Sequence, residues 1–162
     1  MKICRYAPIA LLDSGAGGIG VLREVQKLLP REQLLYFGDT ANAPYGERSD
    51  EEILALVTRA AEHLIPRAKA LVLACNTATS VAAEHLRRRY PAYPIIGMEP
   101  ALRPALHTAP HPRIAVLATA ATLRSKRFAD LCQMYAQNAT VWPISAPATD
   151  VTVRSADGER VS

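Results

Sequence analysis

The chain has 162 residues, of which 49% are hydrophobic and 21% are charged. This composition excludes a disordered tail, a collagen-like repeat and a small disulfide-stapled protein, and the length fits one domain or slightly more. Nineteen Lys and Arg against 15 Asp and Glu give a net charge of +4, which is too small to indicate nucleic-acid binding by itself. No apolar run reaches the ~18 residues that a membrane span needs. The three cysteines fit a reducing compartment, so we expect a soluble cytoplasmic protein with no membrane or nucleic-acid partner.

Short continuous apolar runs alternate with stretches of helical periodicity along the chain. Because these runs lack polar alternation, each is predicted to be a strand covered on both faces. They are residues 8–12, 33–37, 70–74, 94–97 and 114–118, with a further strand expected near 140–144. Helices are expected at 18–29, 49–64, 77–90 and 123–137, the second of them starting with a capping box of Ser49 and Glu52. This alternation predicts an α/β fold with a parallel, doubly wound sheet flanked by helices.

Prolines mark a change in organisation after the fourth predicted strand. Six of the twelve prolines lie between residues 91 and 112, where they limit helix length and favour a semi-rigid connection. We therefore expect a first α/β domain at residues 1–98, a Pro-rich connection at 99–112, and an incomplete second α/β domain with a tail at 113–162. The last segment, 145–162, is polar and aperiodic, which predicts a loop or a frayed tail.

Three polar loops, at residues 13–18, 38–46 and 75–78, follow predicted strands. Ligands of open parallel sheets bind beyond the carboxyl ends of the strands, so these loops should converge on one rim. The first loop formally matches a dinucleotide-binding fingerprint through Gly15, Gly17 and Gly20. Asp13 argues against that function, since its carboxylate would lie beside the amides that must hold a pyrophosphate. A tight strand-to-helix turn explains these glycines more simply.

Cys75 is a sharper signal than the glycines. It lies between a predicted strand and a predicted helix, whose amides and dipole should stabilise a thiolate. An arbitrary cysteine is more often a small buried hydrophobe, but Asn76 and Thr77 add hydrogen-bond donors at the same strand end. Together with Asp13 and Ser14, these residues outline a pocket for a small molecule that carries ammonium and carboxylate groups.

Four segments, taken in order and spacing, resemble the glutamate racemases of the aspartate/glutamate racemase superfamily. They are residues 12–18, 36–41, 44–46 and 74–78, and residues 118–125 continue the similarity. The resemblance implies a cofactor-independent enzyme that interconverts L- and D-glutamate and supplies the D-isomer for bacterial peptidoglycan. It also implies two cysteines on opposite faces of the substrate, one that removes the α-proton and one that returns a proton to the far face.

The same resemblance assigns roles by motif position. Cys75 would be one of the two catalytic acid/bases, and Asp13 would assist it or the substrate ammonium. The residues that would hold glutamate are Ser14, Tyr45, Gly46, Asn76 and Thr77. No metal site is implied, and His107 and His111, which Pro110 separates, lack the further ligands that zinc needs.

The chain departs from the family pattern at the second catalytic cysteine. In the family this residue lies in a Cys-Thr-His motif late in the second domain, and this sequence has no such motif. Cys132 lies inside a helical pattern, and Cys4 precedes the first strand. We therefore expect little or no racemase activity from this chain alone. The alternative is a non-catalytic racemase-like domain that binds an acidic amino acid or a protein partner, and an uncovered strand edge would favour a homodimer.

Overall fold

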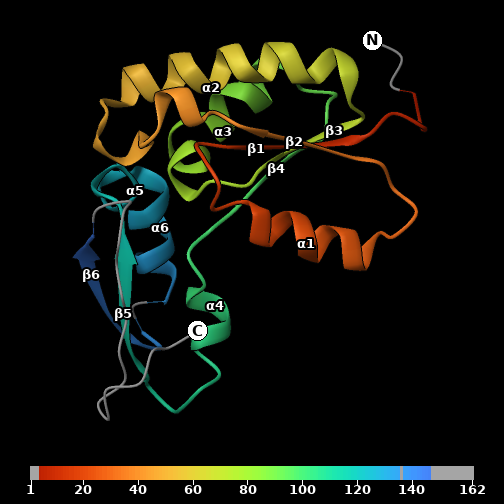
Figure 1. Ribbon diagram of the computed structural model, residues 1–162. Coiled ribbons are helices and arrows are strands. Elements are labelled where there is room, and N and C mark those ends of the chain that lie inside the picture. The colour runs from red at the N-terminus through yellow and green to blue at the C-terminus, as the bar shows by residue number, and fades with distance from the viewer. Residues whose placement is uncertain (1–3, 136, 147–162) are drawn as a thin grey trace.

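The computed structural model describes residues 4–135 and 137–146, in which strands and helices alternate (Figure 1). The strands are β1 (Ile9–Asp13), β2 (Leu34–Gly38), β3 (Ala70–Leu73), β4 (Ile95–Gly97), β5 (Arg113–Ala118) and β6 (Thr140–Ser145). The helices are α1 (Ile19–Leu28), α2 (Asp50–Leu64), α3 (Asn76–Arg89), α4 (Leu102–Ala105), α5 (Ala120–Arg124) and α6 (Lys126–Tyr135). Single 3-10 turns lie at Thr40–Asn42, Tyr45–Glu47 and Ile65–Arg67.

Strands β1 to β4 form a parallel sheet in the order β2-β1-β3-β4. The central position of β1 is clear from Leu11, which is in register with Tyr36 of β2 and with Val72 of β3. Leu11 and Leu12 point to opposite faces of the sheet, and both are 0% exposed. Burial on both faces explains why the strand sequence is continuously apolar. The predicted α/β class with a parallel, doubly wound sheet is confirmed.

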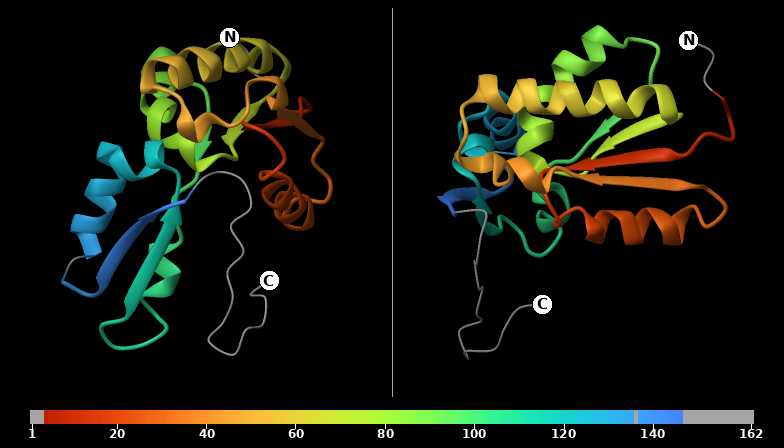
Figure 2. Two further views of the ribbon diagram at one scale, coloured as in Figure 1. Left: turned by 60° about the vertical axis from the view of Figure 1, so that its left-hand side comes forward. Right: turned by 45° about the horizontal axis from the view of Figure 1, so that its top comes forward.

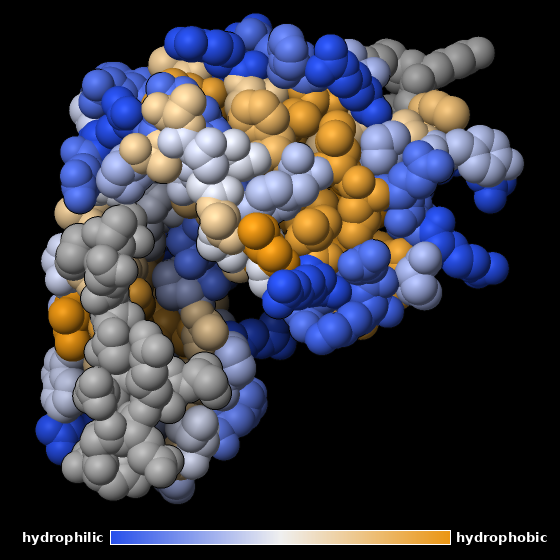
Figure 3. All heavy atoms as spheres, in the orientation of Figure 1, coloured by the Kyte–Doolittle hydropathy of each residue, from blue (hydrophilic) through white to orange (hydrophobic). Residues whose placement is uncertain are grey.

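Helices cover both faces of this sheet, with α1 on one side and α2 and α3 on the other (Figure 2). Val25 of α1 packs toward Leu11 and Val72. Ala10 and Leu12, on the opposite face, belong to the larger core that includes α2 and α3. In the space-filling view, hydrophobic residues gather between α2 above and α1 below (Figure 3). The main apolar core is therefore divided by the sheet into two layers.

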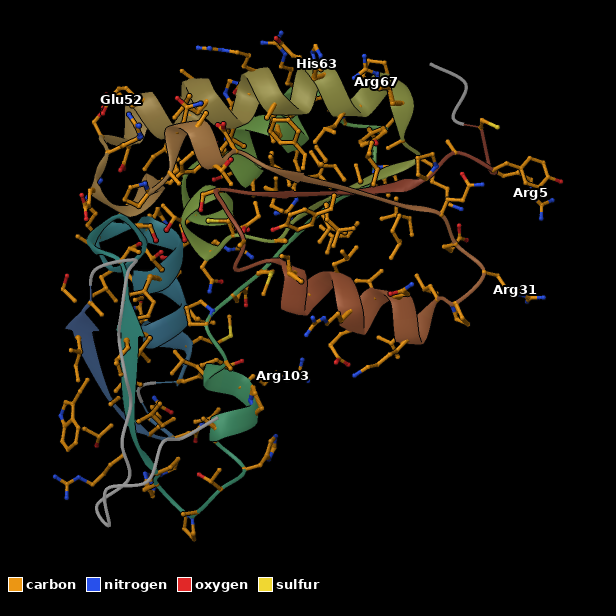
Figure 4. The ribbon with its side chains drawn as sticks, viewed as in Figure 1. Arg5, Arg31, Glu52, His63, Arg67 and Arg103 are labelled. Carbon is orange, nitrogen blue, oxygen red and sulfur yellow. The ribbon has the colours of Figure 1, made fainter. Side chains whose placement is uncertain are left out.

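Helix α2 begins where its sequence predicts. The Glu52 amide donates to the Ser49 hydroxyl at 3.2 Å, and the Ser49 amide donates to the Glu52 carboxylate at 3.0 Å. These two bonds from Ser49 lower the pKa of the Glu52 carboxyl. Figure 4 shows Glu52 at this end of α2 and His63 near the other end. Ile53 and Val57, one turn apart, are both 0% exposed and fix the buried face of the helix.

Strands β5 and β6 form a separate, two-stranded parallel sheet connected through α5 and α6. One face of this sheet packs into a second core, where Val116 meets Phe128 and Leu131 of α6. The other face exposes Leu117 and Trp142 to 44% each. Among residues 4–135 and 137–146, the smaller sheet is therefore covered on one side only.

The strand expected near 140–144 is confirmed as β6, and two other expectations for the second half of the chain differ from the structure at their boundaries. The helix predicted at 123–137 is two helices, because Ser125 is extended (φ −69°, ψ 143°) and its hydroxyl accepts the Phe128 amide at 3.2 Å, capping α6. The predicted tail begins too early, since Ser145 is the last residue of β6, and its remainder from 147 onward lies outside the described residues. The Pro-rich segment 99–112 contains the one-turn helix α4, and the domain boundaries on either side of it stay a prediction.

Candidate functional site

The loops after β1 and β3 meet at the point where the strand order reverses. The chain leaves β1 toward α1 on one face of the sheet, whereas it leaves β3 toward α3 on the opposite face. The Ala74 amide still donates to the Leu12 carbonyl at 2.8 Å, so the two chain segments separate directly after this bond. Asp13 and Cys75 lie at this divergence, which is where open α/β sheets bind their ligands.

Asp13 is nearly buried, at 4% exposed, and its carboxylate organises the first loop. Oδ2 accepts the amides of Gly15 at 3.2 Å and of Gly18 at 2.9 Å. A Cβ on Gly18 would come within 2.8 Å of the Ala74 Cβ, so only glycine lets α1 start so close to β3. The carboxylate occupies the amides that a pyrophosphate would need, which agrees with the argument against a dinucleotide site.

Cys75 is partly buried and sits at the N-cap position of α3. Its sulfur accepts the Ala78 amide at 3.4 Å, so the side chain itself caps the helix. The Ser14 hydroxyl lies 3.5 Å from the same sulfur, although the two residues are 61 positions apart. Asn76 follows in the first turn of α3 with its side chain exposed. The structure thus places Asp13, Ser14, Cys75 and Asn76 along one short stretch of the sheet rim.

Thr77 connects this rim to the second sheet. Its hydroxyl is buried and lies 2.8 Å from the Thr119 hydroxyl and 3.4 Å from the Thr122 hydroxyl, which are themselves 3.1 Å apart. Thr119 and Thr122 were not among the residues expected at the site. The signal was present, since Thr119 directly follows a predicted strand, and its position marks the carboxyl end of β5.

The loop after β2 also reaches the site, but Tyr45 is turned inward. Its side chain is 1% exposed, and its hydroxyl donates to Asp39 Oδ2 at 2.7 Å. Burial, and then the Asp39 carboxylate, raise the pKa of the Tyr45 phenol, with a smaller contribution from Cys75. Gly46 is buried against Thr119, where an added Cβ would lie 2.5 Å from the threonine Cγ2. At the junction with α5, this loop therefore makes its contact through Gly46 and not through the Tyr45 hydroxyl.

The other two cysteines lie elsewhere. Cys4 is exposed before β1. Cys132 packs against the second core, and burial raises the pKa of its thiol. Among residues 4–135 and 137–146, no three His, Cys, Asp or Glu side chains gather as metal ligands do. Within the same ranges, no helix is both long and apolar enough to cross a bilayer.

A crevice of about 550 Å³ lies between α3 and α6, and Cys75 does not line it. Its charged side chains are three cationic and three anionic, and two pairs face each other, Lys126 with Asp130 at 2.6 Å and Arg127 with Glu99. Of the other two, Glu84 pairs with Arg88 outside the crevice and Arg87 donates to the Ile95 carbonyl. Charge at this crevice is therefore balanced within the chain, and the crevice is assigned no part in the chemistry.

The sequence profile of the Asp/Glu/Hydantoin racemase family matches residues 19–160. The chain belongs to this family. It is 47% identical over 152 residues to a glutamate racemase of Pseudomonas paraeruginosa, covering 93% of this chain and 57% of that protein. Among solved structures, a glutamate racemase isoform from Bacillus anthracis matches with a TM-score of 0.77 and 33% identity, covering 88% of this chain and 54% of that one. The Francisella tularensis glutamate racemase, solved in complex with D-glutamate, matches with a TM-score of 0.71 and 30% identity over 85% of this chain and 52% of that one.

The family resemblance expected from the loop motifs is confirmed by these matches. The chain spans between half and three fifths of the length of these racemase relatives. The residue roles inferred from the motifs are a separate matter and stay predictions. The structure brings Asp13, Ser14 and Cys75 together. It turns the buried Thr77 hydroxyl toward Thr119 and commits the Tyr45 hydroxyl to Asp39.

Proposed function

We propose that this racemase-family chain carries one half of a glutamate-binding site, with Cys75 as an acid/base that exchanges the α-proton of glutamate. The observation that supports this most strongly is the contact of the Ser14 hydroxyl with the Cys75 sulfur at the reversal of strand order. The glutamate racemases among its relatives, one of them solved with D-glutamate, supply the substrate class.

The proposed chemistry uses a single sulfur. The Cys75 thiolate removes the Cα proton of glutamate and becomes a thiol, while the electron pair of the broken C–H bond stays on Cα as a carbanion. Return of a proton from the same sulfur restores the starting enantiomer, whereas a proton delivered to the opposite face gives the other enantiomer. Only a thiol and a thiolate take part, so this step needs no metal and no organic cofactor.

The first turn of α3 is proposed to receive a carboxylate of the substrate. Its free amides and the positive end of the helix dipole favour an anion there. Asp13 would hold the ammonium group or assist Cys75. The other residues proposed for the site are Ser14, Tyr45, Gly46, Asn76 and Thr77. Because the Tyr45 side chain is buried and its hydroxyl is bound to Asp39, Tyr45 would act by holding Gly46 in place.

Exchange and inversion can be separated by experiment. The purified chain is incubated with L- or D-glutamate in deuterium oxide, with deuterium at Cα followed by NMR and the enantiomers by chiral chromatography. We expect deuterium uptake with little inversion, because Cys4 and Cys132 do not face Cys75. Cys75→Ser should lower the exchange rate at least ~100-fold, whereas Cys132→Ser, in the second core, should not. Robust inversion, or no binding and no exchange of glutamate, would contradict the proposal.

We also propose that the chain acts in the cytoplasm in the supply of D-glutamate for peptidoglycan, with no nucleic-acid or membrane partner. These statements follow from the family and the proposed substrate. The net charge of +4 is consistent with them.

The second candidate function, association through the open sheet, is favoured by a separate observation. The pairs Ala115–Trp142 and Leu117–Ile144 are in register, so their side chains share the exposed face of the β5–β6 sheet. Such a face matches its own copy in a two-fold dimer, and we propose a homodimer formed through it. Light scattering should give a dimer mass that Trp142→Lys reduces to a monomer mass. A monomer at high concentration in the unmodified chain would contradict this association.

A further inference from the structure

The two oxygens of the Asp13 carboxylate have different surroundings. Oδ2 accepts three hydrogen bonds, from the amides of Gly15 and Gly18 and from the Tyr36 hydroxyl at 3.0 Å. No hydrogen bond to Oδ1 is found among the described residues. The carboxylate is therefore anchored by one oxygen, and the other is left for a ligand or a neighbouring thiol.

Tyr36 is the one side chain among the three donors to Asp13. It lies in the middle of β2, the strand next to β1, and its hydroxyl also lies 2.9 Å from the Gly15 carbonyl. This bridge requires the loop to lie directly on β2. Gly38 makes that approach possible, since a Cβ there would come within 2.3 Å of the Gly15 carbonyl oxygen. The Asp39 amide adds a further link by donating to the Asp13 carbonyl at 2.9 Å.

The Tyr36 hydroxyl is held as a donor over the whole ordinary pH range. Burial, and then the Asp13 carboxylate, raise the pKa of the phenol to about 12, with a smaller contribution from Cys75. The phenol therefore stays protonated where a racemase-type proton transfer would operate.

We propose that Tyr36 is a positioning residue, which fixes the Asp13 carboxylate and the Ser14 hydroxyl relative to Cys75. This inference deepens the proposed function and rests on it. The single hydroxyl hydrogen is shared between Asp13 Oδ2 and the Gly15 carbonyl. Without it the carboxylate keeps only its two amide donors and the bridge to Gly15 is lost, so the loop can shift as a unit. Ser14 belongs to this loop, and its contact with the Cys75 sulfur would loosen with it.

Loss of the Tyr36 side chain could also change the site simply by destabilising the fold, because its ring packs in the apolar layer between the sheet and α1. Tyr36→Phe keeps this ring and removes only the hydroxyl. Tyr93 offers a matched control. It is a buried tyrosine whose hydroxyl donates to the Ala68 carbonyl at 3.0 Å, with burial raising its pKa to about 12, and no site residue is involved.

The test compares the unmodified chain with Tyr36→Phe and Tyr93→Phe by two readouts. The first is Cα deuterium exchange of glutamate, resolved into kcat and KM. The second is alkylation of Cys75 by iodoacetamide, followed at the level of its peptide so that Cys4 and Cys132 are counted separately. The second readout needs no substrate.

For Tyr36→Phe we expect kcat to fall about tenfold with KM changed less than about threefold, the size of one lost hydrogen bond to a charged group. We expect Cys75 alkylation to become roughly fivefold faster as Ser14 releases the sulfur. Tyr93→Phe should leave both readouts within about twofold of the unmodified chain.

The outcomes separate this inference from the proposed function. If the unmodified chain shows no exchange, the proposed function fails, and the alkylation rates alone decide the role of Tyr36. Equal alkylation rates in the unmodified chain and Tyr36→Phe would overturn the inference. It would equally be overturned if Tyr93→Phe changed alkylation as much as Tyr36→Phe, since the effect would then follow general loss of stability.

Discussion

The two sheets of this molecule differ in how completely they are covered. In the four-stranded sheet, Leu12 of β1 and Leu71 of β3 are 0% exposed, and helices lie on both faces. In the two-stranded sheet one face is packed, while Leu117 and Ile144 on the other are 44% and 45% exposed. The side-chain hydrogen bonds of Asp13 and Cys75 all come from this first sheet and the loops and helices attached to it. The second sheet reaches the site through a few contacts made by α5.

The largest expected effect tests this difference in coverage directly. Leu12→Ala should lower the free energy of unfolding by about 3 kcal/mol, because it opens a cavity in a closed core. In the monomer, at concentrations below those at which light scattering shows a dimer, Leu117→Ala removes the same atoms from an exposed position and should change the free energy of unfolding by less than about 0.5 kcal/mol. Urea unfolding followed by circular dichroism measures both. Similar losses would mean that the open face of the smaller sheet is covered in solution.

The next effect concerns the contact that joins the two sheets. In Gly46→Ala the new methyl group would lie 2.5 Å from the Thr119 Cγ2, and such overpacking costs about 2 kcal/mol. Hydrogen–deuterium exchange should show faster exchange in α5, the helix that Thr119 caps. Gly20→Ala is the matched control, because nothing lies within 4 Å of its Cβ position in α1. Gly20→Ala should gain roughly 0.5–1 kcal/mol of stability. If the hydrogen exchange of α5 is unchanged in Gly46→Ala, Gly46 does not hold the two sheets together.

A smaller effect is expected from the threonine hydroxyls at the junction. Thr122→Val should destabilise the chain by about 1 to 1.5 kcal/mol, since it leaves the Thr77 and Thr119 hydroxyls without one partner. Thr58→Val is the control, because the Thr58 hydroxyl oxygen is buried without a hydrogen-bond partner in the part of the chain that is described. Its replacement should be neutral or stabilising. Thermal unfolding measures the stability of the two variants. Equal losses of stability in Thr122→Val and Thr58→Val would rule out a special role for the threonine hydroxyls at the junction.

The smallest effect lies far from the junction, at the start of α2. Ser49→Ala should lower stability by about 0.5–1 kcal/mol through loss of the cap. The pKa of Glu52 is lowered in the folded chain by its bonds to Ser49. The stabilisation from the ionised Glu52 carboxylate is therefore fully present above the ordinary glutamate pKa. It disappears as the pH falls through the lowered pKa of Glu52 in the folded chain. The difference between Ser49→Ala and the unmodified chain should shrink in acid, and a constant difference would contradict the capping-box account.

Much of the first sheet could be predicted from the sequence, because complete burial leaves a simple pattern. The continuous apolar run that contains Leu11 and Leu12 has no polar position, as expected for a strand between two helical layers. Asp13 and Cys75, which the structure brings to one rim, could also be singled out, since each follows such a run; their roles stay a proposal. The spacing of Ser49 and Glu52 was enough to predict the start of α2.

The strand order could not be predicted in the same way. Chain order places β2 between β1 and β3, whereas the sheet places β1 between β2 and β3. The Tyr36 bond to Asp13 and the contact of Ser14 with Cys75 both depend on this order, so neither was visible in the sequence. The break at Ser125 was missed for a different reason. The apolar period continues across it, and only the local capping bond to Phe128 separates the two helices.

The central place of β1 has a consequence for synthesis of the protein. During synthesis, β1 and β2 leave the ribosome before β3, which is residues 70–73. Until β3 emerges, the edge of β1 that faces away from β2 has no strand beside it. An unpaired strand edge whose residues are mostly apolar is a template for wrong pairing. The nascent chain thus passes through an aggregation-prone interval, during which a chaperone that shields extended apolar segments would have most effect. The interval closes when β3 docks, the same event that carries Cys75 to its neighbours.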